Sequence, residues 1–227
     1  MASTIQTIET LRGPAGRLEA LLNVGATDAI YSALVCHPHP PSGGTMHTKV
    51  VFQAAKALNH FGVPVLRFNF RGTGRSEGVH DGGHGEIEDV RAAIDWLHHE
   101  FGLPILLAGF SFGANIGFRA GCGDPRVNGL IGLGMPLEAG GRSYSYEFLK
   151  DCTQPKLLLT GSQDPFAPRA VMERWFKDAP GETTMQWIDG AEHFFAGVPG
   201  SPEMKLDRLQ LAIREWLHAR FFPTVAV

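Results

Sequence analysis

Hydrophobic residues in this chain gather in short runs that end in glycine, proline or a polar residue. Runs of this kind, bounded by turn residues, are typical of strands buried inside a parallel sheet. The clearest runs, each followed by a loop, cover residues 29–37, 63–70, 104–110, 127–136, 156–165 and 183–193. Two further strands, at residues 4–10 and 17–24, flank the turn "RGPAG" and predict an antiparallel opening hairpin.

Between these runs, hydrophobic residues recur at the three- to four-residue spacing of helices. This spacing predicts helices near residues 47–62, 86–102, 111–121, 170–179 and 204–221. Strands that alternate with helices predict a mostly parallel, twisted sheet of about eight strands with helices on both faces. We expect a single α/β domain spanning residues 1–227, because 227 residues is an ordinary single-domain length.

This architecture also predicts where a functional site belongs. In open parallel sheets, ligands bind beyond the carboxyl ends of the strands. The residues that directly follow each predicted strand are therefore the candidates for function.

Charge and hydropathy argue against two classes of partner. The chain has 20 basic and 23 acidic residues, a net charge of −3. Because this net charge is small and no basic cluster is present, we expect no nucleic-acid or anionic-membrane partner. No hydrophobic run approaches the roughly 20 residues that span a bilayer, and the opening "MASTIQTIETLRG" lacks the pattern of a signal peptide. We expect a cytoplasmic protein that is a monomer or a homodimer.

The cysteines and histidines predict neither cross-links nor a metal centre. Cys36, Cys122 and Cys152 are odd in number and lack paired spacing, which predicts buried thiols in a reducing compartment. Prolines interleave His37 and His39, and no compact ligand set of known spacing is present. We therefore expect no metal and no organic cofactor. His37 is expected to fix loops by hydrogen bonds.

The strand at residues 104–110 runs directly into "GFSFG", residues 109–113. Glycines two positions before and after Ser111 allow a sharp strand-to-helix turn that exposes the hydroxyl above the sheet. The helix that follows directs its unpaired backbone N–H groups at the same point. A plain glycine-rich turn is the alternative, but the strand–turn–helix context favours a nucleophile elbow with Ser111 as nucleophile.

A serine hydroxyl needs a base to become nucleophilic, and the base needs an orienting acid. Two histidines follow Ser111 in the sequence, and His218 lies within the last predicted helix, where a surface role is expected. His193, in a loop after a strand, is therefore the expected base. Asp164, directly after a hydrophobic strand, is the expected acid, with Glu138 at another strand end as the alternative.

A tetrahedral intermediate also needs N–H donors for its oxyanion. The backbone N–H of Phe112, the residue after the nucleophile, is one expected donor. The second should come from "HPHPPSGG", residues 37–44, where prolines supply no N–H and His39 lies nearest the strand end. Phe194 and Met135, both near strand ends, are expected to line a hydrophobic substrate pocket.

The segment at residues 138–151, "EAGGRSYSYEFLKD", is the insertion in the sequence that is able to act as a lid. The segment is short. We therefore expect a minimal lid, an open site and a preference for small acyl groups.

Three motifs in this order, "GFSFG", "SQDPFAP" and "GAEHFF", resemble the elbow, acid loop and histidine loop of α/β-hydrolases. "FNFRGTGRSEG" resembles the arginine–glycine loop that many of these enzymes carry after their fourth strand, and Arg71 in it is expected to anchor the loop to backbone carbonyls. "HPHPPSGGTM" and "GPAGRLEALL" resemble the small cap-less bacterial hydrolases near dienelactone hydrolase. The resemblance covers nearly the whole chain and implies the α/β-hydrolase fold.

Carried over residue by residue, the resemblance implies Ser111 as nucleophile, Asp164 as acid and His193 as base. Dienelactone hydrolase uses cysteine where this chain has Ser111, which argues against that specific activity. The oxyanion loop also departs from the pattern, with "HPHP" where many relatives have histidine followed by glycine.

These features predict a carboxylesterase-type serine hydrolase that cleaves a small carboxylic ester, or a thioester, through an acyl-enzyme. Its partner is then a small-molecule acyl substrate. A peptidase or an acyltransferase would use the same triad. A non-catalytic binding protein that retains the fold is the alternative from another class, because fold alone does not imply function.

Overall fold

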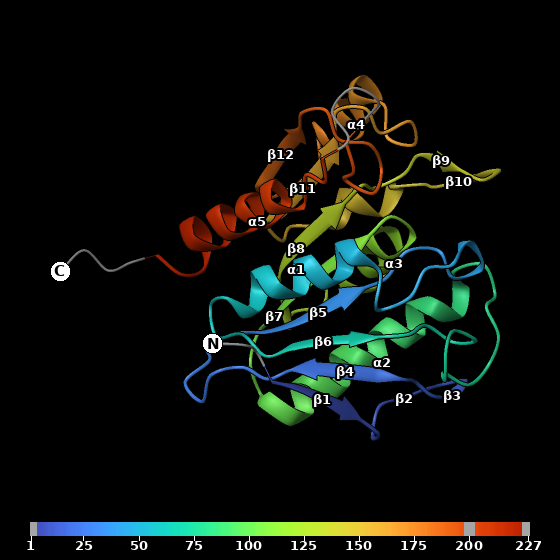
Figure 1. Ribbon diagram of the computed structural model, residues 1–227, viewed down its shortest axis with the longest axis vertical. Coiled ribbons are helices and arrows are strands. Elements are labelled where there is room, and N and C mark those ends of the chain that lie inside the picture. Colours follow the sequence, from blue (N-terminus) through green and yellow to red (C-terminus); the bar gives the residue numbers. More distant parts are fainter. Residues whose placement is uncertain (1–3, 198–202, 224–227) are drawn as a thin grey trace.

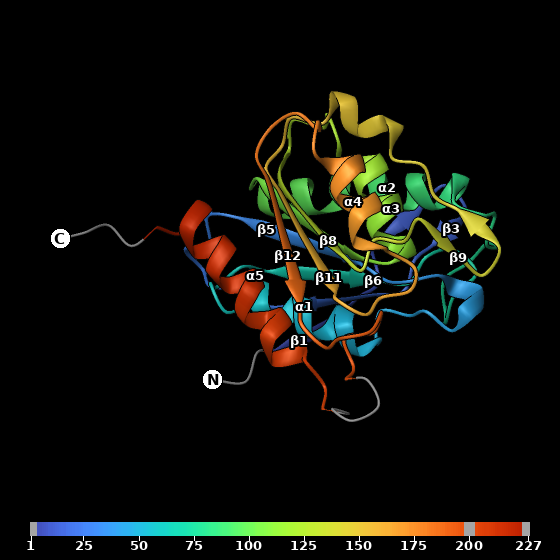
Figure 2. The ribbon, with the colours of Figure 1, turned by 90° about the horizontal axis from the view of Figure 1, so that it is seen from above.

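The computed structural model describes residues 4–197 and 203–223 and arranges them as a sheet between two layers of helices (Figures 1 and 2). The strands of the sheet are β1 (Ile5–Ile8), β4 (Ala20–Asn23), β5 (Ser32–Cys36), β6 (Val65–Phe68), β7 (Ile105–Phe110), β8 (Val127–Leu133), β11 (Lys156–Gly161) and β12 (Thr183–Ile188). Within the described residues these eight strands follow the order β1-β4-β6-β5-β7-β8-β11-β12.

The sheet confirms the predicted mixture of directions. β4 runs antiparallel to both β1 and β6, and every other neighbouring pair is parallel. Every residue of β5, β7 and β11 is buried. Strands covered on both faces are mostly hydrophobic, which is why these segments read as nearly continuous runs in the sequence.

Helices cover both faces of the sheet, as predicted (Figure 2). Their bounds are α1 (Lys49–Asn59), α2 (His84–Phe101), α3 (Phe112–Gly121), α4 (Arg169–Phe176) and α5 (Leu206–Arg220). One hydrophobic core lies under α1 and α5, and a second lies under α2, α3 and α4. Among the described residues, no helix combines the length and hydrophobicity needed to cross a bilayer.

Several short elements complete the chain. A small hairpin joins β2 (Arg12–Gly13) to β3 (Gly16–Arg17), at the turn between the two opening strands. The 3-10 turn η1 (Pro40–Ser42) follows β5. The segment expected to act as a lid forms the hairpin of β9 (Glu138–Ala139) and β10 (Arg142–Ser143), followed by η2 (Glu147–Asp151). In Figure 1 this hairpin projects on the right, the side toward which the parallel strands point.

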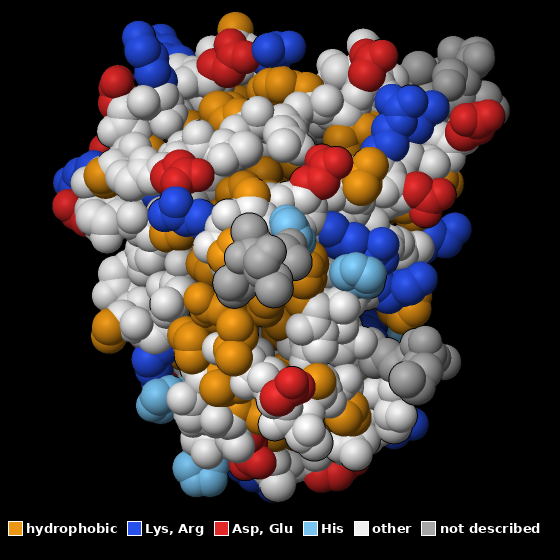
Figure 3. All heavy atoms as spheres, turned by 90° about the vertical axis from the view of Figure 1, so that its left-hand side faces the viewer, with side chains coloured by type: hydrophobic (Ala, Val, Ile, Leu, Met, Phe, Trp, Pro, Cys, Tyr) orange, Lys and Arg blue, Asp and Glu red, His pale blue; other side chains and the backbone are white. Residues whose placement is uncertain are grey.

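Hydrophobic side chains gather on the opposite end of the molecule, which Figure 3 faces. There the ring of Tyr31 packs edge-on against Phe221 and Phe222, with centroids 5.4 Å apart in both pairs. Phe222 also stacks on Phe61 at 4.6 Å. This surface lies at the start of the parallel strands, away from their carboxyl ends.

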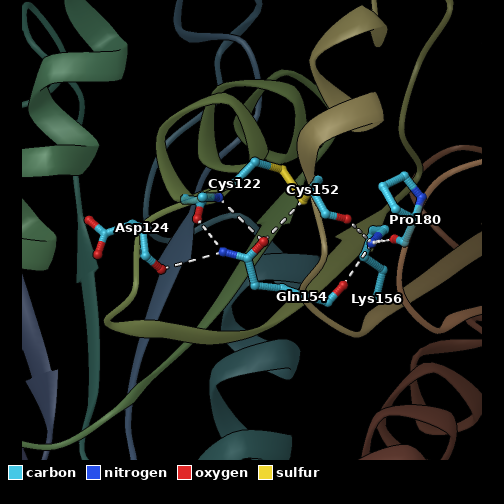
Figure 4. The surroundings of a disulfide bond; sticks show 8 residues. Cys122, Asp124, Cys152, Gln154, Lys156 and Pro180 are labelled. Atoms are coloured by element: carbon cyan, nitrogen blue, oxygen red, sulfur yellow. Dashed lines mark hydrogen bonds between the residues drawn. A yellow bond between two sulfur atoms is a disulfide. The ribbon is translucent and has the colours of Figure 1, made fainter.

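A disulfide between Cys122 and Cys152 contradicts the expectation that all three cysteines are thiols (Figure 4). Cys122 follows the end of α3 and Cys152 follows η2, and the fold brings their Cα atoms within 4.9 Å. Residues 30 positions apart in sequence give no spacing signal, so the pairing depends on tertiary structure. Cys36 is a buried free thiol, and burial raises its pKa.

Beside the disulfide, a buried lysine organises the segment that leads into β11 (Figure 4). The Lys156 ammonium donates to the carbonyl oxygens of Cys152, Gln154 and Pro180, each at 2.7 Å. Burial lowers the pKa of Lys156 to about 8. Three carbonyl acceptors match the three N–H groups of an ammonium, so no donor of this buried charge is left unpaired.

His37 fixes the loop that follows β5. Its Nε2 accepts the N–H of Phe70 at 3.0 Å, and its Nδ1 lies 2.7 Å from the carbonyl oxygen of Pro38. A carbonyl only accepts, so Nδ1 carries the proton and the ring is neutral. Burial lowers the pKa of His37 to about 4. The expected hydrogen-bonding role is confirmed, and it ties the ends of β5 and β6 together.

Removing the disulfide should weaken the fold. The variant Cys122→Ser/Cys152→Ser should lose about 2–4 kcal/mol of unfolding free energy, because the cross-link restricts the unfolded chain. Urea unfolding with and without dithiothreitol measures this: reductant should lower the midpoint of the wild-type protein and of a Cys36→Ala control, but not of the double variant. A wild-type midpoint that reductant leaves unchanged would contradict the cross-link.

His37 should make stability depend on pH. Its pKa is about 4 in the folded protein and 6.5 in its ordinary state, so the unfolded chain takes up a proton first as pH falls. Stability present above pH 6.5 is then lost toward pH 4, by up to about 1.4 kcal/mol per pH unit. The variant His37→Gln should show a correspondingly shallower slope in urea unfolding measured across this range. An exposed control, His99→Gln, should keep the wild-type slope. If the stability of His37→Gln depends on pH as steeply as that of the wild-type protein, the low pKa assigned to His37 is refuted.

Candidate active site

Ser111 occupies a sharp turn between β7 and α3, as the sequence predicts. Its backbone has φ 55° and ψ −121°, a positive-φ conformation that residues other than glycine rarely adopt. The two flanking glycines are required by close packing. A Cβ atom at Gly109 would lie 2.6 Å from Ala114 Cα, and one at Gly113 would lie 2.7 Å from the carbonyl carbon of Cys36.

The structure brings Ser111, His193 and Asp164 into one hydrogen-bonded chain. His193 Nε2 lies 3.0 Å from Ser111 Oγ, and His193 Nδ1 lies 2.8 Å from Asp164 Oδ2. All three residues are buried, between 5% and 6% exposed. A carboxylate only accepts, so Nδ1 donates to Asp164 and Nε2 is left to accept the serine proton. This is the arrangement that activates a serine hydroxyl.

The loop after β11 holds Asp164 in place. Its second carboxylate oxygen, Oδ1, accepts the backbone N–H of Phe166 at 2.9 Å. The N–H of Asp164 itself donates to the carbonyl of Gly161 at 3.1 Å. With Oδ1 engaged by its own loop, Oδ2 points at the imidazole.

The loop after β12 positions His193. The Glu192 carboxylate accepts the backbone N–H groups of Phe194 and Ala196, at 2.8 and 2.9 Å, and so closes a tight turn around the histidine. The imidazole lies among the rings of Phe110, Phe166 and Phe194, with centroids 4.8–5.3 Å away. These rings fix the plane of the imidazole and shield it from water.

The competing candidates lie elsewhere. Glu138 is exposed on β9 of the hairpin, paired in register with Ser143. His218 is exposed on α5. Among the described residues, the acid that contacts the His193 imidazole is therefore Asp164.

A cavity of about 350 Å³ opens over Ser111 and His193. Phe194 lines it, as expected, and is 49% exposed. Met135 does not, because its side chain is fully buried in the core. A Cβ atom at Gly132 would lie 2.9 Å from Met135 Cγ, so the methionine fills the space that this glycine leaves. The expectation that Met135 lines the pocket was wrong.

The two expected oxyanion donors flank the same point. Phe112 is the first residue of α3, where a backbone N–H has no acceptor within the helix. His39 precedes η1 and lines the cavity over Ser111. Its Nδ1 lies 2.9 Å from Ser42 Oγ, and its ring packs edge-on against Phe112. Their role as donors stays a prediction.

The hairpin contributes residues that the sequence analysis did not single out. Arg142 and Tyr144 line the cavity over Ser111, and Arg142 Nε donates to Tyr144 Oη at 3.3 Å. Burial, followed by the nearby Arg142 and His80 side chains, lowers the pKa of His39 to about 4. The signal in the sequence that could have identified Arg142 and Tyr144 is their alternate spacing, which places both side chains on one face of an extended segment.

Arg71 anchors its loop, but to a carboxylate rather than to backbone carbonyls. Its Nη2 and Nε donate to the buried Asp89 of α2 at 2.7 and 3.0 Å, and its own backbone N–H donates to the same group at 3.0 Å. Asp89 lies 18 residues along the chain, a separation that periodicity alone does not connect with Arg71. Among the described residues, no cluster of three His, Cys, Asp or Glu side chains is placed to hold a metal ion.

Comparison with known proteins assigns this chain to a family. Residues 32–219 match the family model described as "Alpha/beta hydrolase domain". A protein of Rickettsia prowazekii, described as uncharacterized, is 34% identical over 212 residues, which cover 90% of this chain and 86% of that protein.

Solved structures agree with this result. An alpha-beta serine hydrolase homologue from Coxiella burnetii is 33% identical, with a TM-score of 0.81 over 96% of this chain and 98% of that one. XC6422 from Xanthomonas campestris, described as a serine hydrolase without a lid, is 32% identical, with a TM-score of 0.79 over 99% and 97% of the two chains. The expected resemblance and fold are thus confirmed: this chain belongs to the α/β-hydrolase family, and it is a hydrolase.

Proposed function

We propose that the protein is a carboxylesterase-type serine hydrolase that cleaves a small ester, or a thioester, through an acyl-enzyme. The observation that carries this proposal is the hydrogen-bonded chain from Ser111 through His193 to Asp164. It ends in a cavity at the carboxyl ends of the parallel strands, where ligands bind in open sheets.

In the proposed first half-reaction, Ser111 Oγ attacks the carbonyl carbon of the ester while His193 Nε2 takes the hydroxyl proton. Asp164 stabilises the imidazolium that results, and the carboxylate keeps its charge. The tetrahedral intermediate collapses, the bond to the leaving group breaks, and His193 returns the proton to the departing alcohol or thiol. The acyl group is then bonded to Ser111.

In the second half-reaction, His193 removes a proton from water, which attacks the acyl-enzyme carbonyl. Collapse of this second intermediate releases the carboxylic acid and returns the proton to Ser111. In both steps the backbone N–H groups of Phe112 and His39 are the proposed donors to the oxyanion. Such donors stabilise the charge that develops in the transition state.

The cavity supports a preference for small acyl groups. Its volume is about 350 Å³, and the rings of Phe166 and Phe194 form part of its wall. The 138–151 segment borders it through residues 139, 140, 142 and 144, at and just after the β9–β10 hairpin. A site with so short a cover offers little hydrophobic surface to a long chain.

Loss of the nucleophile should abolish turnover. Ser111→Ala should lower kcat by about 10⁶, and Asp164→Asn by about 10⁴ through the wrong imidazole tautomer, both measured on p-nitrophenyl acetate. The matched control Asp189→Asn changes an exposed acid four residues before His193 and should keep wild-type turnover. A Ser111→Ala variant with ordinary activity would disprove the role. Faster turnover of amides, or acyl transfer to an added alcohol in place of hydrolysis, would reassign the reaction to a peptidase or an acyltransferase.

Acyl-chain length should also have a clear optimum. We expect kcat/KM for p-nitrophenyl esters to be highest for short chains of about two to four carbons and to fall for longer ones, because the cavity is small and open. A series from acetate to palmitate measures this. A steady rise up to the longest chains would contradict the proposed size preference.

A further inference from the structure

A second cavity adjoins the one over Ser111. Its volume is about 590 Å³, and His39, Arg142 and Tyr144 border both cavities. One wall is α3, the helix that begins beside Ser111, which contributes Asn115 and Arg119. The facing wall is the segment from β10 toward η2. The two cavities therefore border each other at these three residues.

Two arginines line this second cavity, and neither is neutralised by a carboxylate. Among residues 4–197 and 203–223, no ion pair within 4.0 Å joins Arg119 or Arg142 to an acid. By contrast, Arg71 and Arg126 each hold a carboxylate at 2.7 Å. Among the described residues that line this cavity, Glu147 is the one with a carboxylate. Its side chain is exposed and pairs with neither arginine.

Arg142 is held in place while much of its guanidinium stays available. Its Nε donates to Tyr144 Oη at 3.3 Å, and its Nη1 lies 3.4 Å from the carbonyl oxygen of Gly140. A guanidinium has five N–H groups, so these contacts leave three without an acceptor. The arginine is half-buried on β10, between the two cavities, where its charge is less screened than on an open surface.

His39, which borders both cavities, adds no positive charge of its own. Burial, and then the nearby Arg142 and His80 side chains, lower the pKa of His39 to about 4. His39 is therefore neutral at pH 7, and the fixed positive charge between the cavities comes from Arg142, with Arg119 on α3 beyond it. A ligand group placed there meets N–H donors and a positive potential.

We propose that the second cavity is a carboxylate subsite. The preferred substrate is then an ester that extends from the reacting carbonyl past Arg142 and carries a carboxylate in this second cavity. This inference rests on the proposed esterase function and names its substrate class. A planar guanidinium fork matches a carboxylate in a bidentate geometry, and the pairing is stronger than a neutral hydrogen bond. Arg119, which is exposed, adds a longer-range attraction.

Matched ester pairs test the subsite on either side of the reacting bond. On the acyl side, p-nitrophenyl hydrogen adipate is compared with its methyl ester, and on the alcohol side, 4-acetoxybenzoate with its methyl ester. In at least one pair, Arg142→Gln should lower the ratio of kcat/KM for the charged member to kcat/KM for the neutral member about tenfold or more. Comparing variant with wild type cancels the intrinsic reactivity of each ester.

Further variants separate charge from geometry and from folding. Arg119→Gln, at an exposed position, should reduce kcat/KM for the charged member by a smaller factor. Arg142→Lys should restore part of the loss, because it keeps the charge but not the fork. Arg174→Gln, which removes an exposed charge from α4, should change neither ester. Raising the salt concentration should reduce the effect of Arg119 more than that of Arg142.

The outcomes distinguish the subsite from the activity. If the wild-type protein hydrolyses the esters and neither arginine variant changes the charged-to-neutral ratio in either pair, the subsite is refuted and the esterase proposal stands. If the wild-type protein hydrolyses no member of either pair, the esterase proposal fails, and the subsite fails with it. A selective loss on the charged member, in Arg142→Gln or in Arg119→Gln, supports the subsite.

Discussion

The proposed chemistry depends on one imidazole that is hydrogen-bonded on both sides. His193 contacts Ser111 through Nε2 and Asp164 through Nδ1, and thereby joins the loops that follow β7, β11 and β12. Each loop is fixed by its own contacts: glycines that allow close packing at β7, the Phe166 N–H on Asp164, and the Glu192 carboxylate beside the histidine. The parallel sheet supplies the constraint that these three strands end at the same edge.

Most of this arrangement could be predicted from the sequence, because the signals are local. Continuous hydrophobic runs identify strands buried on both faces, and β5, β7 and β11 are buried at every position. The elbow is specified by two glycines around Ser111. The sequence favoured Asp164 because it directly follows a strongly hydrophobic strand, with Glu138 at another strand end as the alternative, and the structure places Asp164 against the imidazole.

The features that could not be predicted depend on residues far apart in the chain. The cross-link of Cys122 to Cys152 and the pairing of Arg71 with Asp89 follow from how helices pack, which no local spacing records. Met135 was misplaced because its side chain fills the space beside Gly132 rather than the cavity. Arg142 lines the cavity because the segment forms a hairpin near the strand ends, whereas the sequence showed that segment only as a short insertion able to act as a lid.

Covalent labelling measures whether the Ser111 hydroxyl is activated, without any knowledge of the natural substrate. The protein is treated with a fluorophosphonate, and the adduct is located by mass spectrometry of intact protein and of peptides. We expect one adduct per chain, on Ser111, formed much more slowly in Asp164→Asn and absent in Ser111→Ala. Wild-type protein that gains no adduct, or gains it at another residue, would show that the Ser111 hydroxyl is not activated.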